Sequence, residues 1–565
     1  MTNHTQRRGA AVAAVAAAVV AAIVGIVAGQ GTAAPDPGPK QPPHPTKAEK
    51  FKHPKLKHGV LLVTGTKVDD NITLRLQGGR SDKLEVVVGD DGKTFRFDRK
   101  HIATIEVDAA TGDDFVNIDE SNGVFTDTIP TTIDGGDGND TIAGGTGNET
   151  LSGGEGNDTI DGNGGSDIAF LGAGDDTFVW DPGDGSDTVE GQDGVDTMLF
   201  NGANANERVA LSANGNRLLF LRSPANIAMD TNGVETVDFN ALGGADIVTV
   251  GDLTGTDVKA VNVDLAGTLG GTIADGATDR ISVDGTAGAD RISVNGDTSS
   301  VTTSGLSSTV TVQHQDPTDL LDVEGLGGDD DISAAPLAAQ AIALLLNGGD
   351  GDDKLAGGKG VETLNGGDGN DSIDGNGGND AALMGAGDDT FVWDPGDGSD
   401  TIEGGDGADT MIFNGANGAE KVELSANGNR LKFTRDLAGI TMDTAGVENV
   451  DFNALGGADL VTVHDLTGTD VTDVIVDLAG TLGGATGDAA ADDVVVEGTN
   501  GDDAIKVSGD STAIKVRGLA AGTTILNAEA ADRLDVNTQA GTDTVQSAGL
   551  AAGSIHLFVD GVAVP

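Results

Sequence analysis

The sequence predicts an all-β solenoid, because a large unit is duplicated, a nine-residue repeat runs inside that unit, and the composition cannot fill a large globular core. Aromatic residues make up 3% of the 565 residues, cysteine and tyrosine are absent, and 89 residues are glycine. Such a composition remains compatible with many small stacked layers. Repetition can therefore make one long body from units that do not fold alone.

The largest repeat has a period of 213 residues. The stretch GAGDDTFVWDPGDGSDT at 172–188 recurs letter for letter at 385–401. Likewise, DFNALGGAD at 238–246 returns at 451–459. We therefore expect two tandem units of the same construction.

Inside each unit the chain repeats every nine residues. The first block begins at Gly135 and reads GGDGNDTIA, GGTGNETLS, GGEGNDTID, GNGGSDIAF and LGAGDDTFV, then, after a two-residue insertion, PGDGSDTVE and GQDGVDTML. Seven similar nonads begin at Gly348. Glycine permits the positive backbone angles of a tight turn, so each nonad is expected to form a six-residue turn and a three-residue strand. Apolar eighth residues, such as Ile142 and Leu151, would align into a continuous ladder when the repeats stack.

The sixth residue of every nonad is acidic, so stacking brings carboxylates close together. Without a counter-charge they would repel one another strongly. Aspartate and glycine carbonyl oxygens, with no cysteine or suitably placed histidine, favour Ca2+ over Zn2+ or Mg2+. The 91 acids comprise 74 Asp and 17 Glu, and the short Asp side chain suits a ligand in a tight turn. A merely solubilising acidic surface is the alternative.

These GGxGxDxUx nonads resemble the RTX, or haemolysin-type, calcium-binding repeat family. The resemblance implies a right-handed parallel β-roll in which two nonads make one turn. It also implies that sixth-position aspartates and turn carbonyls of nonads n and n+2 hold each Ca2+, with about five ions per block. The candidate metal ligands are Asp137, Asp140, Asp158, Asp167, Asp176, Asp187, Asp196, Asp350, Asp353, Asp371, Asp380, Asp389, Asp400 and Asp409. The pattern is broken by Glu149 and Glu362 at the sixth position and by Leu171 and Met384 at the first.

Residues 1–34 have the features of a secretory signal: Arg7 and Arg8, a long apolar run, and a small-residue GTAA site. An uncleaved membrane anchor is the alternative, because the run is long enough to span a bilayer. Residues 35–58 carry seven prolines, six lysines and three histidines and are expected to form a linker. Its basic charge could contact an anionic cell wall.

The rest of the chain divides by composition into alternating blocks and looser segments. We expect an N-terminal strand-rich solenoid segment at 59–130, calcium-binding β-rolls at 131–200 and 344–413, a strand-rich spacer at 201–343 and a C-terminal strand-rich segment at 414–565. Stretches such as LGGADIVTV at 242 keep a loosened form of the turn-and-strand pattern and favour longer solenoid rungs. A separate globular sandwich is the alternative for these segments.

Composition and motifs also limit the function. A formal charge of -59 excludes a nucleic-acid binder that works by phosphate neutralisation. No HExxH or GxSxG motif is present. We therefore expect a secreted, extracellular, non-catalytic calcium-binding protein with a structural, adhesive or surface-associated role and no transmembrane segment in the mature chain. The alternative is a polysaccharide-acting β-helix enzyme, or a carbohydrate-binding module of one, in which Trp180 and Trp393 stack on sugar rather than pack inside the roll.

Overall fold

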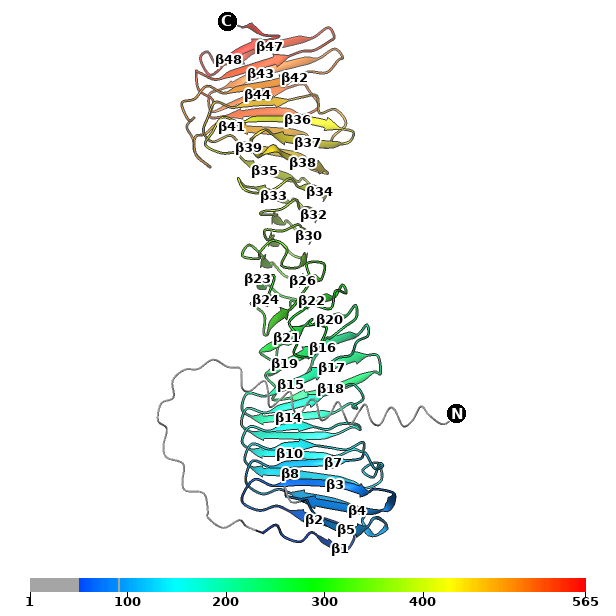
Figure 1. The fold of residues 1–565 in the computed structure, drawn as a ribbon. Coiled ribbons are helices and arrows are strands. Elements are labelled where there is room, and N and C mark those ends of the chain that lie inside the picture. Colours follow the sequence, from blue (N-terminus) through cyan, green and yellow to red (C-terminus); the bar gives the residue numbers. More distant parts are fainter. Residues whose placement is uncertain (1–49, 90–91, 565) are drawn as a thin grey trace, which may run out of the picture. The chain divides into compact units, whose positions relative to one another are not determined.

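The computed structural model describes residues 50–89 and 92–564, whose regular secondary structure is almost entirely β-strand (Figure 1). The predicted signal at 1–34 and the linker up to residue 49 lie outside the described residues. Helical structure in the described part is confined to two 3-10 turns, η1 (Arg99–His101) and η2 (Leu437–Gly439). None of the helices found there has the length and apolar character that crossing a membrane requires.

The chain separates into two compact units, and each carries one nonad block. Of the described residues, unit 1 comprises 50–89, 92–202, Ala213–Asn240 and Gly255–Lys259. Unit 2 comprises Ala203–Ser212, Ala241–Thr254 and Ala260–Pro565.

In unit 1 the nonads alternate between two parallel sheets, as expected if two nonads make one turn. One sheet contains β8 (Thr131–Asp137), β10 (Thr150–Glu155), β12 (Ile168–Ala173) and β14 (Thr188–Asp193), whose stacking is visible in Figure 1. The other contains β9 (Thr141–Ala143), β11 (Thr159–Asp161), β13 (Thr177–Trp180) and β15 (Thr197–Asn201). Leu151 pairs with Ile133 and Ala169, so apolar residues lie over one another from turn to turn. The predicted solenoid ladder is confirmed.

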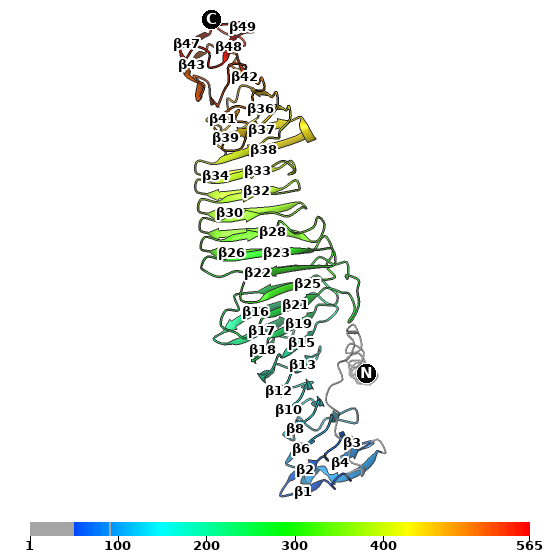
Figure 2. The ribbon, with the colours of Figure 1, turned by 90° about the vertical axis from the view of Figure 1, so that its left-hand side faces the viewer.

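The block of unit 2 repeats this arrangement. One sheet stacks β28 (Ala343–Asp350), β30 (Glu362–Asp368), β32 (Ala381–Ala386) and β34 (Thr401–Asp406) (Figure 2). The other stacks β29 (Lys354–Ala356), β31 (Ser372–Asp374), β33 (Thr390–Trp393) and β35 (Thr410–Asn414). All these neighbours pair in parallel.

Strands of the expected three residues are found in one sheet, whereas the strands of the other sheet are longer than expected. β9 and β11 have three residues, whereas β10 has six because it includes Gly153, Gly154 and Glu155 of the following nonad. Gly154 pairs with Gly136 and Gly172. A Cβ atom on Gly154 would lie 1.9 Å from the Gly136 carbonyl oxygen, so only glycine lets the backbones approach closely enough to extend the ladder.

The segments outside the blocks continue the parallel ladders. In unit 1, β2 (Val60–Thr64) pairs with β6 (Thr104–Asp108), and β3 (Asn71–Gln77) with β7 (Phe115–Asp119). In unit 2, β20 (Ile247–Val250), β22 (Arg280–Asp284) and β26 (Leu320–Gly327) lead into β28. After the second block, β40 (Leu460–Val463), β42 (Asp493–Glu497), β46 (Arg533–Asn537) and β48 (His556–Val559) pair in the same way.

Antiparallel hairpins and further rungs complete both units. In unit 1 these are β1 (Lys55–Lys57), β4 (Arg80–Val88), β5 (Lys93–Asp98), β17 (Arg217–Ser223), β18 (Ile227–Asn232) and β19 (Thr236–Asn240). Most of the remaining strands lie in unit 2: β16 (Arg208–Asn214), β21 (Ala260–Asp264), β23 (Arg291–Asp297), β24 (Ser300–Ser304), β25 (Thr309–Gln313), β27 (Asp331–Ser333), β36 (Lys421–Asn427), β37 (Arg430–Arg435), β38 (Ile440–Ala445), β39 (Asn449–Asn453), β41 (Asp473–Asp477), β43 (Ala504–Asp510), β44 (Ala513–Arg517), β45 (Gly522–Leu526), β47 (Thr544–Leu550) and β49 (Val562–Ala563).

The predicted linker ends earlier than residue 58. Lys55–Lys57 forms β1, antiparallel to β2. His58 and Gly59 both have positive φ, 51° and 88°, which is the geometry of a tight two-residue hairpin turn. The last residues of the proline- and lysine-rich segment therefore belong to the first rung.

The two tryptophans pack inside the rolls, in agreement with the packing interpretation. Trp180 is 1% exposed. Its ring stacks on Phe200 with centroids 4.0 Å apart, and its indole N–H donates to the Gly185 carbonyl at 2.9 Å. Trp393 makes the equivalent contacts with Phe413 and Gly398 in unit 2. Each insertion is thus fixed from within, and neither indole face is available for stacking on sugar.

Candidate metal centre

The sixth-position carboxylates of unit 1 form two buried columns. In the first, the backbone N–H of Asp140 donates to Asp158 Oδ1 at 2.7 Å, that of Asp158 to Asp176 Oδ1 at 2.7 Å, and that of Asp176 to Asp196 Oδ1 at 3.0 Å. In the second, the backbone N–H of Glu149 donates to Asp167 Oδ1 at 2.7 Å, and the backbone N–H of Asp167 donates to Asp187 Oδ1 at 2.8 Å. Each bond joins nonad n to nonad n+2, so the columns exist only in the stacked roll.

Unit 2 has the same two columns. Backbone N–H groups join Asp353 to Asp371, Asp371 to Asp389 and Asp389 to Asp409 at 2.7–3.0 Å. They also join Glu362 to Asp380 and Asp380 to Asp400 at 2.8 and 2.9 Å. The duplicated sequence therefore produces a duplicated site.

The second carboxylate oxygen of every sixth-position aspartate is buried and has no hydrogen-bond partner. These oxygens are Oδ2 of Asp140, Asp158, Asp167, Asp176, Asp187, Asp196, Asp353, Asp371, Asp380, Asp389, Asp400 and Asp409. A buried polar atom without a partner is costly, and a buried charge more so, unless it is paired or coordinates a metal. The columns therefore provide acceptors that lack a donor or a cation.

In six of these rungs the unpartnered oxygen converges with a backbone carbonyl; they begin at Gly135, Gly153, Gly191, Gly348, Gly366 and Gly404. A Cβ atom on Gly153 would lie 2.2 Å from Asp158 Oδ2 and 2.3 Å from the Leu171 carbonyl oxygen. A Cβ atom on Gly366 would lie equally close to Asp371 Oδ2 and the Met384 carbonyl oxygen, and Gly135 and Gly348 have similar surroundings. Because glycine at the first position has no Cβ atom, the space between the carboxylate oxygen and the carbonyl oxygen stays open.

This donor set fits Ca2+. Carboxylate and carbonyl oxygens in a flexible arrangement are the ligands Ca2+ prefers. Within residues 50–89 and 92–564, no three His, Cys, Asp or Glu side chains gather in a metal-binding group. Backbone carbonyls must therefore complete the coordination of any ion, and the sixth-position aspartates would contribute its charged ligands.

Burial raises the pKa values of the column carboxylates. Desolvation raises the pKa of Asp158 and Asp371 to about 7 and the pKa of Asp167 and Asp380 to about 8. In each case the bond from a backbone N–H opposes the shift. Without a cation, several of these groups hold protons near neutral pH, and a cation would take the place of those protons.

We call one turn with its following strand a rung. The backbone conformation of the second residue of the turn distinguishes two kinds of rung. In an open rung, where the sixth-position Oδ2 has no partner, the second residue has positive φ, as at Gly154 (123°), Gly367 (119°) and even Gln192 (78°). In a closed rung, the N–H of the second residue donates to one oxygen of the carboxylate, as Gly145 does to Glu149 Oε2 at 2.8 Å, although Glu149 Oε1 stays buried without a partner. Gly358 donates to Glu362 Oε2 in the same way at 3.1 Å. The two glutamates that break the sequence pattern therefore bond to their own turns.

Asp137 and Asp350 lie outside the columns. Their side chains are exposed, unlike those of the sixth-position aspartates. Their backbone carbonyls accept the N–H groups of Gly112 and Gly328, both at 2.7 Å. The structure therefore brings together twelve of the fourteen predicted ligands and leaves these two side chains in solvent.

Two glutamates that the sequence interpretation missed end the longer columns. Glu235 Oε2 accepts the backbone N–H of Asp196 at 2.8 Å, and Glu448 Oε2 that of Asp409 at 2.9 Å. Both lie beyond the last nonad, so the nine-residue pattern does not reach them. The 213-residue period does relate them, since 448 minus 235 is 213.

Stacked nonads, paired parallel sheets and buried carboxylate columns together define a calcium-binding β-roll. Comparison with known families agrees: the model for the RTX calcium-binding nonapeptide repeat (4 copies) matches residues 132–148, 143–178, 183–204, 345–361, 357–391 and 396–418. The chain thus carries RTX calcium-binding nonapeptide repeats in both units, which confirms the resemblance seen in the sequence.

The other comparisons add little to this identification. A search of curated proteins gave no match. Among solved structures, the crystal structure of extracellular lipase LipA from Serratia marcescens is matched at 15% identity and a TM-score of 0.13. The match covers 61% of this chain and 42% of the lipase, so this chain spans less than half of that protein. At these values neither fold nor activity is transferred.

Proposed function

We propose that this protein is secreted, folds when it binds extracellular Ca2+, and has a non-catalytic structural or adhesive role at a surface. The observation that carries the proposal is the set of buried aspartate Oδ2 atoms without partners in both units. Calcium outside the cell would satisfy these oxygens and neutralise the columns. In its absence, too little apolar area opposes their repulsion.

Calcium binding and folding are coupled in this proposal. The ligands of nonads n and n+2 come together only when the turns stack, so the free energy of binding becomes free energy of folding. Of the five n to n+2 pairs in the first block, four join two aspartates and one begins at Glu149. We expect the four aspartate pairs to hold their ions most tightly, because affinity depends on the charge and fit of the ligands.

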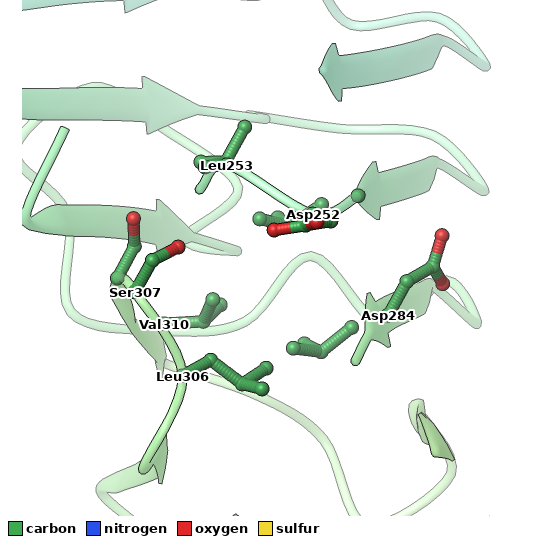
Figure 3. Close-up of a pocket in the computed structure, with 10 residues that line it drawn as sticks. Asp252, Leu253, Asp284, Leu306, Ser307 and Val310 are labelled. Atoms are coloured by element: carbon green, nitrogen blue, oxygen red, sulfur yellow. The ribbon is translucent and has the colours of Figure 1, made fainter. Parts of the chain in front are cut away.

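A polysaccharide-acting enzyme is the competing proposal, and a small hollow in unit 2 is where we would test it. Asp252 and Asp284 border the hollow together with serines and aliphatic side chains. In Figure 3 the Asp284 carboxylate points away from Leu306 and Val310 rather than into a shared cleft with them. Hydrolysis of a glycosidic bond requires two carboxylates that flank the substrate, so a loss of activity on changing Asp284 would be the sign of an enzyme at this hollow.

Two experiments test the proposal. N-terminal sequencing of secreted material should begin near Ala34 or Pro35, and a chain that stays in the membrane from Met1 would contradict release. Assays of the pure calcium-loaded protein for protease, esterase and lyase activity should show no turnover. Reproducible cleavage of a polysaccharide that Asp284→Asn abolishes would favour the enzyme instead.

A further inference from the structure

Open rungs also occur outside the nonad blocks, and the one at Asp330 directly precedes the second block. Asp330, in the stretch GLGGDDDIS at 325–333, precedes the second block and the family match that begins at residue 345. Its side chain is 2% exposed. Oδ1 accepts the backbone N–H of Asp290 at 2.7 Å, whereas Oδ2 is buried without a partner. The backbone N–H of Asp330 in turn donates to Asp353 Oδ1 at 2.7 Å, so Asp330 continues a column of the roll.

The surroundings of Asp330 Oδ2 match those in the blocks. A Cβ atom on Gly325 would lie 2.3 Å from Asp330 Oδ2 and 2.3 Å from the Gly348 carbonyl oxygen. The corresponding distances at Gly366 are 2.2 and 2.3 Å. The same convergence of one carboxylate and one carbonyl oxygen is therefore present one rung before the consensus nonads.

The backbone at Leu326 keeps this rung open. Leu326 occupies the second position with φ of 74°, a left-handed conformation that costs a leucine on the order of 1–2 kcal/mol. Its side chain is 48% exposed, so burial does not offset that cost. In the preceding rung of the same column, the Thr286 N–H donates to Asp290 Oδ2 at 2.6 Å and closes it. The strained Leu326 thus leaves Asp330 Oδ2 without a donor, whereas the corresponding oxygen of Asp290 in the preceding rung has one.

We propose that Asp330 Oδ2 and the Gly348 carbonyl bind an additional divalent cation of the Ca2+ class. The inference rests on the proposed calcium function and extends it beyond the recognised repeats. Unit 1 provides an informative contrast: Asp114 also has an unpartnered Oδ2, and Ala110 has φ of 83°. There, however, Ala109 replaces the first glycine, and its methyl group occupies the place that Gly325 leaves free. We expect no ion at Asp114.

The test counts bound Ca2+ on the full mature chain by native mass spectrometry. Asp330→Asn keeps an acceptor for the Asp290 N–H but replaces the second oxygen with an amide, so it should bind one ion fewer than the wild type. The matched control, Asp290→Asn, alters a closed rung and should bind the wild-type number. An unchanged count for Asp330→Asn would overturn the extra site, whereas a wild-type chain that binds no Ca2+ would overturn the calcium function as a whole.

If Asp330→Asn does not fold, a second variant tests the additional cation site. Leu326→Gly removes the penalty for left-handed backbone, so at limiting Ca2+ the last ion should bind about fivefold more tightly than in the wild type. An unchanged affinity for every ion would contradict a site held open by this residue.

Discussion

Two rungs of unit 2 differ at three turn residues, the second among them, and in whether their carboxylate is hydrogen-bonded by its own turn. GTNGDD at 498–503 and GGDGND at 366–371 both begin with glycine and end with aspartate. In the first, the Thr499 N–H donates to Asp503 Oδ2 at 2.8 Å. In the second, Gly367 has φ of 119° and Asp371 Oδ2 has no partner. The backbone of the second residue thus decides whether the chain satisfies its own carboxylate or needs a cation to do so.

The largest effect is expected when an open rung loses its glycine backbone. Gly367→Ala places a Cβ atom 2.0 Å from the Gly349 carbonyl oxygen at a φ that alanine rarely adopts. We expect a loss of about 3 kcal/mol or more, measured by thermal unfolding in saturating Ca2+. Gly428→Ala is the control, since it has φ of 70° but nothing within 4 Å, and it should cost about 1 kcal/mol. Equal losses would show that the close approach of the rungs is unimportant.

The pH dependence of the calcium-free chain provides the next test. Burial raises the pKa of Asp158 and Asp371 from the ordinary value of 3.8 to about 7. The folded state therefore binds more protons than the unfolded state between these values, so its stability falls as pH rises from about 4 to 7. In chelator, far-UV circular dichroism should show more β-structure at pH 5 than at pH 7.5. More structure at pH 7.5 would contradict buried, unneutralised columns.

Removing one ligand should have a smaller effect than either change. Asp371→Asn in an open rung should raise the Ca2+ midpoint of folding about tenfold, because affinity depends on ligand charge. Asp503→Asn in a closed rung should leave the midpoint unchanged. Calcium titration of both variants beside the wild type measures the difference, and equal midpoints for the two variants would remove the distinction between open and closed rungs.

The smallest effect is expected at the two exposed aspartates. Asp137→Asn and Asp350→Asn keep the backbone carbonyls that face Gly112 and Gly328 and change only exposed side chains. Their Ca2+ midpoints should stay within about twofold of the wild-type value, since water and salt screen the interactions of exposed charges. A shift as large as that of Asp371→Asn would place these side chains among the ligands.

Much of the fold could be predicted from the sequence, because turn chemistry and apolar positions repeat in register. The period of nine fixed the position of Asp158 relative to Asp140 and Asp176, and the hydrogen bonds between nonads n and n+2 follow from it. The status of Asp330 could not be predicted in this way. It depends on a left-handed Leu326, and leucine has no local preference for that conformation. Residue type likewise did not reveal that Glu362 folds back onto the Gly358 N–H.

The most direct test of the account is a calcium titration of the secreted mature chain, followed by far-UV circular dichroism with the bound ions counted at each step. In chelator at neutral pH both blocks should be largely disordered, and Ca2+ should restore the β-signal cooperatively as ions bind. A strand signal that chelator leaves unchanged, with no bound calcium detected, would contradict the account and leave an acidic solenoid that does not need a metal.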